Sequence, residues 1–193
     1  MKPLKGTKTE VNLLTAFAGE SQARNRYDYF ASIAKKDGYV QIMHIFQETA
    51  LQEKEHAKRL FKYLTEGHEV TISAGFPAGK MGSTLENLYA SAEGEKHEHE
   101  IMYPEFAVIA EQEGLVEIAN TFKAIAVAEA FHEERYRAFI HNIEKDIVFA
   151  RPGQDIMWRC RNCGYIHHGP EALDECPACV HPRAHFEIAC KNW

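Results

Sequence analysis

The chain has 193 residues, of which 45% are hydrophobic, 26% charged and 11% aromatic. This composition is typical of globular proteins with a buried core, and the length fits one mid-sized domain with a small satellite, which excludes a large two-domain enzyme. The formal net charge is −6, so the chain lacks the excess of basic residues that favours binding to nucleic acid or to an anionic membrane. We therefore expect neither partner. The sequence has no long uncharged apolar run and begins with a polar stretch, which predicts a cytoplasmic protein.

Four segments repeat apolar residues at helical spacing, which predicts four long helices. They cover residues 9–37, 39–66, 84–113 and 115–146. Turns at Gly38 and Gly114 make the helices within each pair antiparallel, and residues 67–82 form a long connection between the two pairs, with Gly67 expected to end the second helix. These features predict an all-α, ferritin-like four-helix bundle over residues 1–150.

The two predicted helical hairpins repeat one another at a spacing of 76 residues, which aligns Tyr27 with Tyr103. Glu20 needs a spacing of 75 residues to reach its counterpart Glu95, so one extra residue lies between Glu95 and Tyr103. A single inserted residue in a continuous helix is usually absorbed as a π-bulge, and such bulges favour functional sites. The sequence therefore predicts a π-bulge in the third helix, with a simple kink at Pro104 as the alternative.

Glu-x-x-His units interrupt the apolar stripes of the second and fourth predicted helices, as Glu53 with His56 and as Glu129 with His132. Residues three apart share a helical face, so each unit can direct a carboxylate and an imidazole to one point inside the bundle. Buried carboxylates close to one another require positive charge. We therefore expect both units to bind metal.

The other two helices supply Glu20 from the first and Glu95 with Glu98 from the third. Carboxylate-bridged di-iron and di-manganese proteins show this pattern, in which two helices supply glutamates and the other two supply Glu-x-x-His units. The alternative is that these glutamates lie on solvated helix faces. Tyr27 and Tyr103 are placed to hydrogen-bond the ligating carboxylates, or else to pack as ordinary core aromatics.

All five cysteines lie near the end of the chain, and four of them form two CxxC units separated by twelve residues. The units are Cys160 with Cys163 and Cys176 with Cys179. This spacing predicts a tetrahedral site of four thiolates in a small second domain over residues 151–193. Zinc and iron both accept these ligands, so a zinc ribbon and a one-iron electron carrier remain open. Cys190 lies outside both units and is expected to be a free thiol.

Cys-Gly-Tyr after the first unit and Cys-Pro in the second resemble rubredoxin, although Val180 stands where rubredoxins usually have glycine. Over its whole length the chain resembles the rubrerythrin family, on the stretches AFAGESQARNRY, QEKEHAKRLF, FPAG, IAVAEAFHEERY and WRCRNCGYIHHG. The resemblance implies a di-iron bundle followed by a rubredoxin-like Fe(Cys)4 domain, with three iron ions per chain.

The resemblance also implies how the bundle would hold its metals. Glu53 and Glu129 would bridge the two iron ions, and Glu20, Glu95 and His132 would be terminal ligands.

The remaining two ligands, Glu98 and His56, are implied to exchange at one iron as its oxidation state changes. The implied activity is the reduction of hydrogen peroxide to water in oxidative stress protection, with Glu98, Tyr27 or Tyr103 handling protons. Electrons would pass through the rubredoxin-like iron from an external donor, either a rubredoxin or an NAD(P)H-dependent reductase.

The family further implies a head-to-tail homodimer. Two alternatives to a peroxidase are a ferritin-like protein that oxidises and handles iron, and a non-enzymatic scaffold whose tail binds zinc. A four-thiolate electron carrier is superfluous where iron itself supplies the electrons, which favours peroxide reduction.

Overall fold

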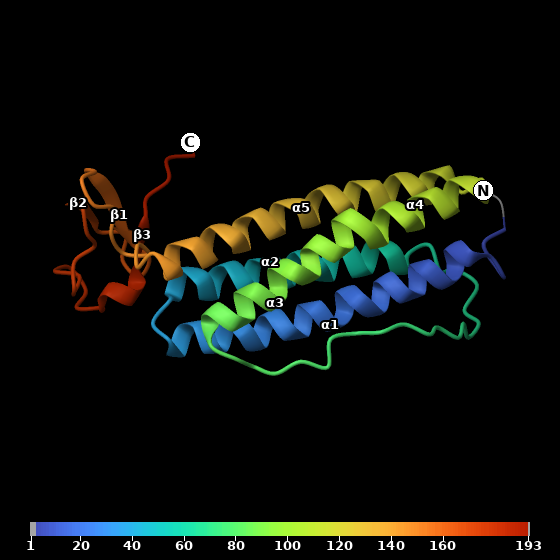
Figure 1. Ribbon diagram of the computed structural model, residues 1–193, viewed down its shortest axis with the longest axis horizontal. Coiled ribbons are helices and arrows are strands. Elements are labelled where there is room, and N and C mark those ends of the chain that lie inside the picture. The colour runs from blue at the N-terminus through green and yellow to red at the C-terminus, as the bar shows by residue number, and fades with distance from the viewer. Residues whose placement is uncertain (1–2, 193) are drawn as a thin grey trace.

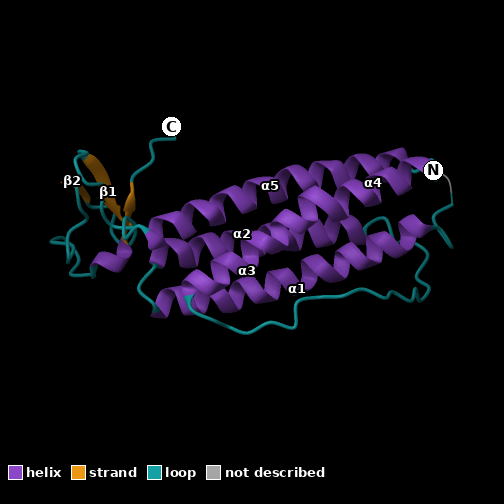
Figure 2. Cartoon of the chain, viewed as in Figure 1, coloured by secondary structure: helices purple, strands orange, loops and turns teal. Residues whose placement is uncertain are grey.

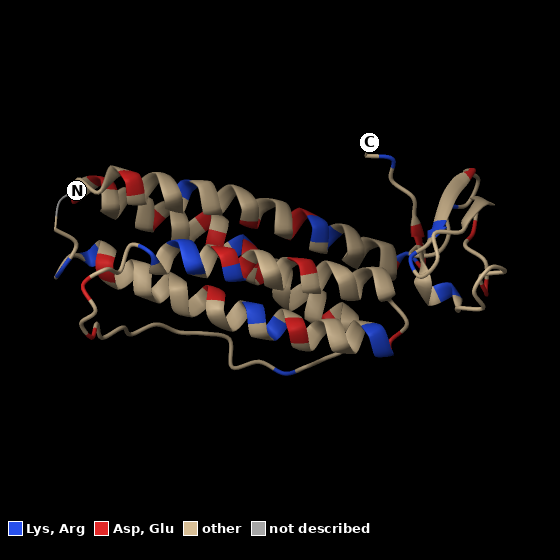
Figure 3. Ribbon diagram, turned by 180° about the vertical axis from the view of Figure 1, so that it is seen from behind, with Lys and Arg blue, Asp and Glu red and all other residues tan. Residues whose placement is uncertain are grey.

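The computed structural model describes residues 3–192 and contains a long helical bundle with a small sheet domain at one end (Figure 1). The helical elements are α1 Lys8–Lys36, α2 Val40–Phe61, α3 Thr84–His97, the π-helix η1 Glu98–Met102, α4 Tyr103–Gln112 and α5 Val116–Glu144. Because α3, η1 and α4 run on as one rod, the bundle has four long members, and the predicted fold class is confirmed. Acidic and basic residues are interspersed along these rods (Figure 3).

The bundle consists of two antiparallel hairpins, as the turn signals predict. α1 packs along α2, and α3 and α4 pack along α5. Gly38 and Gly114 close the two turns with φ angles of +86° and +77°, a left-handed conformation that glycine adopts without steric cost. The serine before α3 begins that helix with a capping box, in which the Ser83 hydroxyl accepts from Glu86 N–H and the Glu86 carboxylate accepts from Ser83 N–H.

The second helix ends earlier than predicted, at Phe61, and Gly67 lies in the loop beyond it. Tyr63 N–H bonds Leu60 O at 3.1 Å, which tightens the last turn. The Tyr63 hydroxyl lies 2.8 Å from the Thr121 hydroxyl. Thr121 lies on α5 of the other hairpin, and helical periodicity within one helix does not predict such a contact between hairpins.

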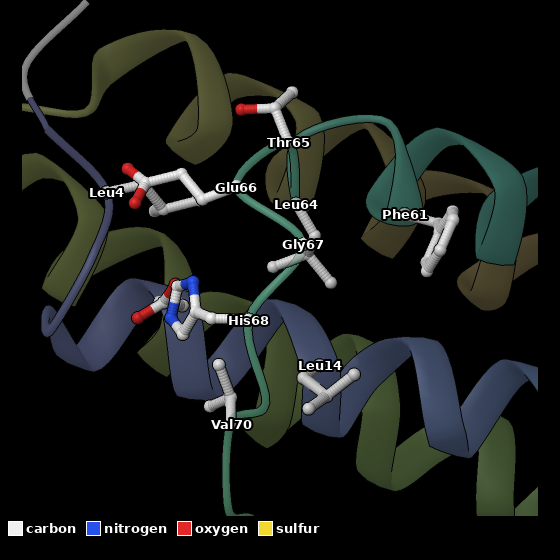
Figure 4. Close-up of a pocket in the computed structure, with 10 residues that line it drawn as sticks. Leu4, Leu14, Phe61, Leu64, Thr65, Glu66, Gly67, His68 and Val70 are labelled. Carbon is white, nitrogen blue, oxygen red and sulfur yellow. The ribbon is translucent and has the colours of Figure 1, made fainter.

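A crossover segment of residues 62–83, without helix or strand, runs along the outside of α1 and joins the two hairpins (Figures 1 and 2). Near its start, His68 Nε2 lies 3.0 Å from Glu10 Oε1. This pair lies beside a cavity of about 270 Å³ that Leu4, Leu14 and Val70 also line (Figure 4). The contact attaches the crossover segment to the first turn of α1.

The predicted π-bulge is present as η1, between Glu95 and Tyr103. Tyr103 N–H bonds Glu98 O, five residues back, which is the π-helical spacing. Pro104, at the start of α4, cannot donate to the carbonyl of Glu100, which helps keep the α-helical ladder open here. The inserted residue is therefore accommodated by a widened turn.

Two hydrophobic clusters fill the bundle, one on each side of its middle. One cluster, which includes Phe30, Phe46 and Phe139, lies toward the sheet domain. The other, which includes Leu13 and Phe122, lies toward the amino terminus. Helices from both hairpins contribute to each cluster, so the short polar segment between them is enclosed on both sides.

The small domain is an antiparallel sheet with strand order β2-β1-β3, made of β1 Ile156–Cys160, β2 Ile166–Gly169 and β3 Phe186–Ile188, with a 3₁₀ turn η2 Arg183–His185. Trp158 and Phe186 form its core, and Trp158 Nε1 donates to Gly169 O at 3.0 Å. The domain lies against the bundle, where the rings of Tyr39 and Phe149 stack at 6.2 Å. The boundary near residue 150 stays a prediction. Across residues 3–192, every helix is too short or too polar to cross a bilayer.

Candidate metal centres

The predicted ligands of the bundle converge in two overlapping groups. In the first group, ligand atoms of Glu20, Glu53, His56 and Glu129 all lie within 4.8 Å of one another. In the second group, ligand atoms of Glu53, Glu95, Glu129 and His132 also lie within 4.8 Å of one another. Glu53 and Glu129 belong to both groups, so each can contact two cations at once. The four glutamates are at most 1% exposed.

Both imidazoles face the carboxylates with the same nitrogen. His56 Nδ1 lies 2.9 Å from Glu53 Oε2 and 2.9 Å from Glu129 Oε1. His132 Nδ1 lies 2.7 Å from Glu129 Oε2 and 3.2 Å from Glu53 Oε1. The two Glu-x-x-His units are therefore arranged alike, as their sequence repeat predicts.

Gln52 also belongs to this site, although no sequence pattern indicates it. Its Oε1 lies 3.0 Å from His132 Nε2, on the side of the ring away from the carboxylates. A hydrogen bond at this second nitrogen fixes the orientation and the tautomer of a metal-binding imidazole. Gln52 directly precedes Glu53, but no rule of spacing indicated that it would reach across to α5.

Neighbouring groups in the site have pKa values that move in opposite directions. Burial opposes ionisation of Glu53, but hydrogen bonds from His132 and His56 outweigh it and lower the pKa of Glu53 to about 2. Burial raises the pKa of Glu95 to about 8, against a hydrogen bond from His132. Burial also raises the pKa of Glu20, and the charge of Glu129 adds to the effect. The protein alone therefore cannot hold all these carboxylates in their charged form at neutral pH.

Unsatisfied polar atoms show that the site fits cations. Among the described residues, twelve buried side-chain nitrogen and oxygen atoms have no partner in hydrogen-bonding geometry, and six of them gather at this site: Glu20 Oε2, Glu53 Oε1, Glu95 Oε2, Glu129 Oε1 and Oε2, and His132 Nδ1. Each such atom costs about 1–3 kcal/mol when it is left unpaired. All six belong to the two ligand groups, and oxygen-rich sites with imidazole suit iron or manganese.

Two buried tyrosines bond the same glutamates from outside the ligand groups. The Tyr27 hydroxyl donates to Glu95 Oε1 at 2.5 Å, and the Tyr103 hydroxyl donates to Glu20 Oε1. Each tyrosine reaches the glutamate of the other hairpin, so the contacts are reciprocal. Burial raises the pKa of both tyrosines, and the nearby glutamate charges raise it further.

Glu98 lies beside the ligand groups and belongs to neither. Glu98 is half-buried in η1. Its carboxylate has no hydrogen-bond partner among the described residues. Burial raises the pKa of Glu98, and the charges of Glu95 and Glu20 raise it further. Its neighbour His99 pairs with Glu133, at 2.6 Å from Nε2 to Oε2.

The second predicted centre, in the sheet domain, has the geometry of a four-thiolate site. The four sulfur atoms lie within 4.8 Å of one another, with Cys160 Sγ 3.7 Å from Cys179 Sγ and Cys163 Sγ 3.6 Å from Cys176 Sγ. A tetrahedral ion with metal–sulfur bonds of about 2.3 Å requires sulfur separations of about 3.8 Å.

The thiol pKa values also indicate a cation at this centre. The backbone N–H of Tyr165 favours the Cys163 thiolate, but the sulfur atoms of Cys179, Cys176 and Cys160 together with burial outweigh it and raise the pKa of Cys163 to about 12. Four thiolates therefore need a cation to ionise together. Cys190 is free, exposed and outside this group.

Two family models match the chain in the two regions just described. The rubrerythrin model matches residues 11–140, and the model of the rubrerythrin rubredoxin-like domain matches residues 158–187. The chain is 61% identical to rubrerythrin from Nitratidesulfovibrio vulgaris over 193 residues, which covers 100% of both chains. It is 56% identical to rubrerythrin from Porphyromonas gingivalis over 192 residues, which covers 100% of this chain and 95% of the relative.

Solved structures share the same architecture. The fully reduced, all-ferrous state of nigerythrin has a TM-score of 0.63 at 34% identity, covering 97% of this chain and 89% of that one. The bacterioferritin of Desulfovibrio desulfuricans has a TM-score of 0.65 at 21% identity, covering 72% of this chain and 81% of that one, which shows the shared bundle fold. With its carboxylate and histidine groups in the bundle and its four cysteines in a rubredoxin-like domain, the chain belongs to the rubrerythrin family.

Proposed function

We propose that this protein is a non-haem di-iron peroxidase that reduces hydrogen peroxide to water with electrons passed through a rubredoxin-like iron centre. The observation that carries the proposal is the combination of two centres in one chain: a buried carboxylate site for two metals, and a separate four-thiolate site suited to one-electron transfer. A protein that only oxidises iron has no use for the second centre. The proposal assigns three iron ions to each chain.

The two ligand groups suggest which residues would hold each iron. Glu53 and Glu129, which both groups share, would bridge the pair. Glu20 with His56 would complete one position, and Glu95 with His132 the other. When bound, the iron pair would supply the two electrons and the Lewis acidity that peroxide reduction requires.

The residues of the chain would supply the protons that peroxide reduction requires. Reduction of one hydrogen peroxide to two water molecules consumes two electrons and two protons. Burial raises the pKa of Glu98, which favours the protonated carboxyl group that can donate to a departing oxygen. We assign Glu98 this role, with Tyr27 and Tyr103 keeping the terminal carboxylates in place, and we retain the exchange of Glu98 with His56 as part of the proposal.

A head-to-tail homodimer would bring the tail of one copy to the bundle of the other. In support, the His56 side chain is 18% exposed and lines an open cavity of about 460 Å³ with Arg59 and Thr121. The large apolar residues Val127 and Phe131 of α5 are exposed. The tail would receive electrons from an external rubredoxin or NAD(P)H-dependent reductase, in the cytoplasm, where thiols remain reduced.

The proposal is tested by anaerobic titration of fully reduced, metal-analysed protein with hydrogen peroxide, following the visible bands of both centres. We expect the tail iron and the bundle site to reoxidise together, in proportion to two electrons per peroxide. A response from the bundle alone, or a colourless zinc tail, would instead indicate an iron-oxidising protein or a scaffold.

A further inference from the structure

A cavity of about 320 Å³ lies between α1, η1 and the crossover segment, and we call it the crossover cavity. Three of its lining residues directly precede residues of the bundle site: Gly19 before Glu20, Gly94 before Glu95, and Met102 before Tyr103. Glu98 also lines it. The cavity therefore reaches the proposed proton donor.

The crossover cavity is much larger than hydrogen peroxide, which has two non-hydrogen atoms. Its volume of 320 Å³ is about ten times the ~30 Å³ that a water molecule takes in the liquid. Much of its wall is apolar, formed by Phe76, Pro77, Ile101, Met102 and Phe106. Apolar walls and a few convergent polar groups are the usual features of a small-molecule site.

Two helix-interior glycines, Gly19 and Gly94, line this cavity. Neither Gly19 nor Gly94 has a positive φ angle, so the backbone does not require glycine. A Cβ at Gly94 would meet nothing within 4 Å, and one at Gly19 would lie 3.8 Å from the Phe76 ring, an ordinary contact. Glycine destabilises a helix interior relative to alanine. The space beside both glycines is open, so a larger side chain at either position would extend into the cavity.

We propose that the crossover cavity is a binding site for organic hydroperoxides. The organic group would pack against Phe76, Ile101 and Met102, with the peroxide group directed to Glu98. This inference rests on the proposed peroxidase function and extends its substrate class.

In the extended reaction the O–O bond of ROOH breaks as it accepts two electrons from the reduced protein, replenished by the external donor. One proton goes to each oxygen. The products are the alcohol ROH and one water molecule.

Turnover of cumene hydroperoxide and of hydrogen peroxide tests the substrate class. We expect the wild-type protein to reduce both. Gly94→Leu should lower the ratio of kcat/KM for cumene hydroperoxide to that for hydrogen peroxide about tenfold or more, since its side chain extends into the cavity. Gly94→Ala is the matched control, which adds one carbon where nothing lies within 4 Å and should keep this ratio within about twofold.

Binding of the redox-inert product 2-phenyl-2-propanol gives a readout that does not depend on turnover. By calorimetry on the oxidised holoprotein, wild type and Gly94→Ala should bind it, and Gly94→Leu should bind it about tenfold more weakly or not at all. A crystal structure should show the alcohol beneath Phe76.

Three outcomes would overturn the inference. The first is reduction of hydrogen peroxide without reduction of cumene hydroperoxide, and the second is equal binding of the alcohol to wild type and Gly94→Leu. The third is failure to reduce either peroxide, which would reject the peroxidase function itself and the hydroperoxide assignment with it.

Discussion

At the scale of single residues, Glu20 and Glu95 each use their two carboxylate oxygens differently. Oε1 of Glu95 accepts from Tyr27, and Oε2 faces His132 at 3.7 Å. Oε1 of Glu20 accepts from Tyr103, and Oε2 faces His56 at 3.8 Å. One oxygen is therefore held by a tyrosine of the other hairpin, which leaves the second free to bind a cation.

Removing one of these hydroxyls should weaken the bundle site. Tyr27→Phe leaves Glu95 Oε1 without its donor, and loss of such an outer hydrogen bond costs about 10–100-fold in metal affinity or activity. Iron affinity by competition with a chelator, together with peroxide turnover, measures the loss. The matched control is Tyr136→Phe, because Tyr136 is equally buried and its hydroxyl has no partner among the described residues. Equal effects of the two substitutions would contradict the assigned role of Tyr27.

Glu98→Gln tests the proton-donor role. Glutamine has nearly the same shape but cannot give up a proton, so peroxide turnover should fall about 10²-fold or more. The visible absorption of the tail should not change, since Glu98 lies in η1 of the bundle and the four cysteines lie in the sheet domain. Stopped-flow reoxidation by hydrogen peroxide measures the rate, and an unchanged rate would remove Glu98 from the mechanism.

At the scale of elements, the sequence predicts what depends on local periodicity. The stripe positions of Glu53 and Glu129 place both carboxylates inside the bundle, and the one-residue insertion locates η1. The end of α2 at Phe61 is not marked by this periodicity, and neither is the contact of Tyr63 with Thr121 of α5 just beyond it. Gln52 was missed because its partner His132 lies on the other hairpin. Contacts between the hairpins made by residues outside the repeated motifs are therefore what the sequence pattern leaves out.

The last cysteine turn of the tail contains a strained residue. Val180 follows Cys179 with a φ angle of +57°, in the left-handed region that costs non-glycine residues about 1–2 kcal/mol. It is 69% exposed, so little packing is lost on its removal. Val180→Gly should raise the free energy of unfolding of the sheet domain by about 1 kcal/mol.

Thermal loss of the tail absorption measures this change. Ile166→Gly in β2 is the control, because Ile166 is also exposed but has no positive φ angle, and it should destabilise the domain by about 1 kcal/mol. Destabilisation by both substitutions would show that Val180 is not strained.

At the scale of the whole molecule, the two hydrophobic clusters stabilise the bundle while the site between them opposes folding when no metal is bound. The clusters enclose a segment with four buried glutamates and the buried His132. Without a cation, some of these carboxylates must stay protonated, as the raised pKa values of Glu20 and Glu95 indicate. The stability of the metal-free protein should therefore depend on pH in a way that the metal-bound protein does not share.

The direction of this dependence follows from Glu95. Its pKa is about 8 in the folded protein, against an ordinary value of 4.5, so the folded state holds a proton that the unfolded state releases. The stabilisation from that proton is fully present below about pH 4.5 and is lost as the pH rises to about 8. Urea unfolding of the metal-free protein at several pH values between 5 and 8 should show a falling free energy of unfolding. Glu95→Gln cannot titrate and should reduce this slope.

Bound iron should reverse the trend, because metal binding requires the carboxylates in their charged form and so strengthens as they lose protons. The free energy of unfolding of the iron-loaded protein should then exceed that of the metal-free protein by a margin that grows from pH 5 to pH 8. If metal-free wild type and Glu95→Gln instead shared one slope, another group would have to carry the proton. If the margin stayed constant with pH, iron binding would not be displacing protons from this site, and the buried carboxylates would already be charged in the metal-free bundle.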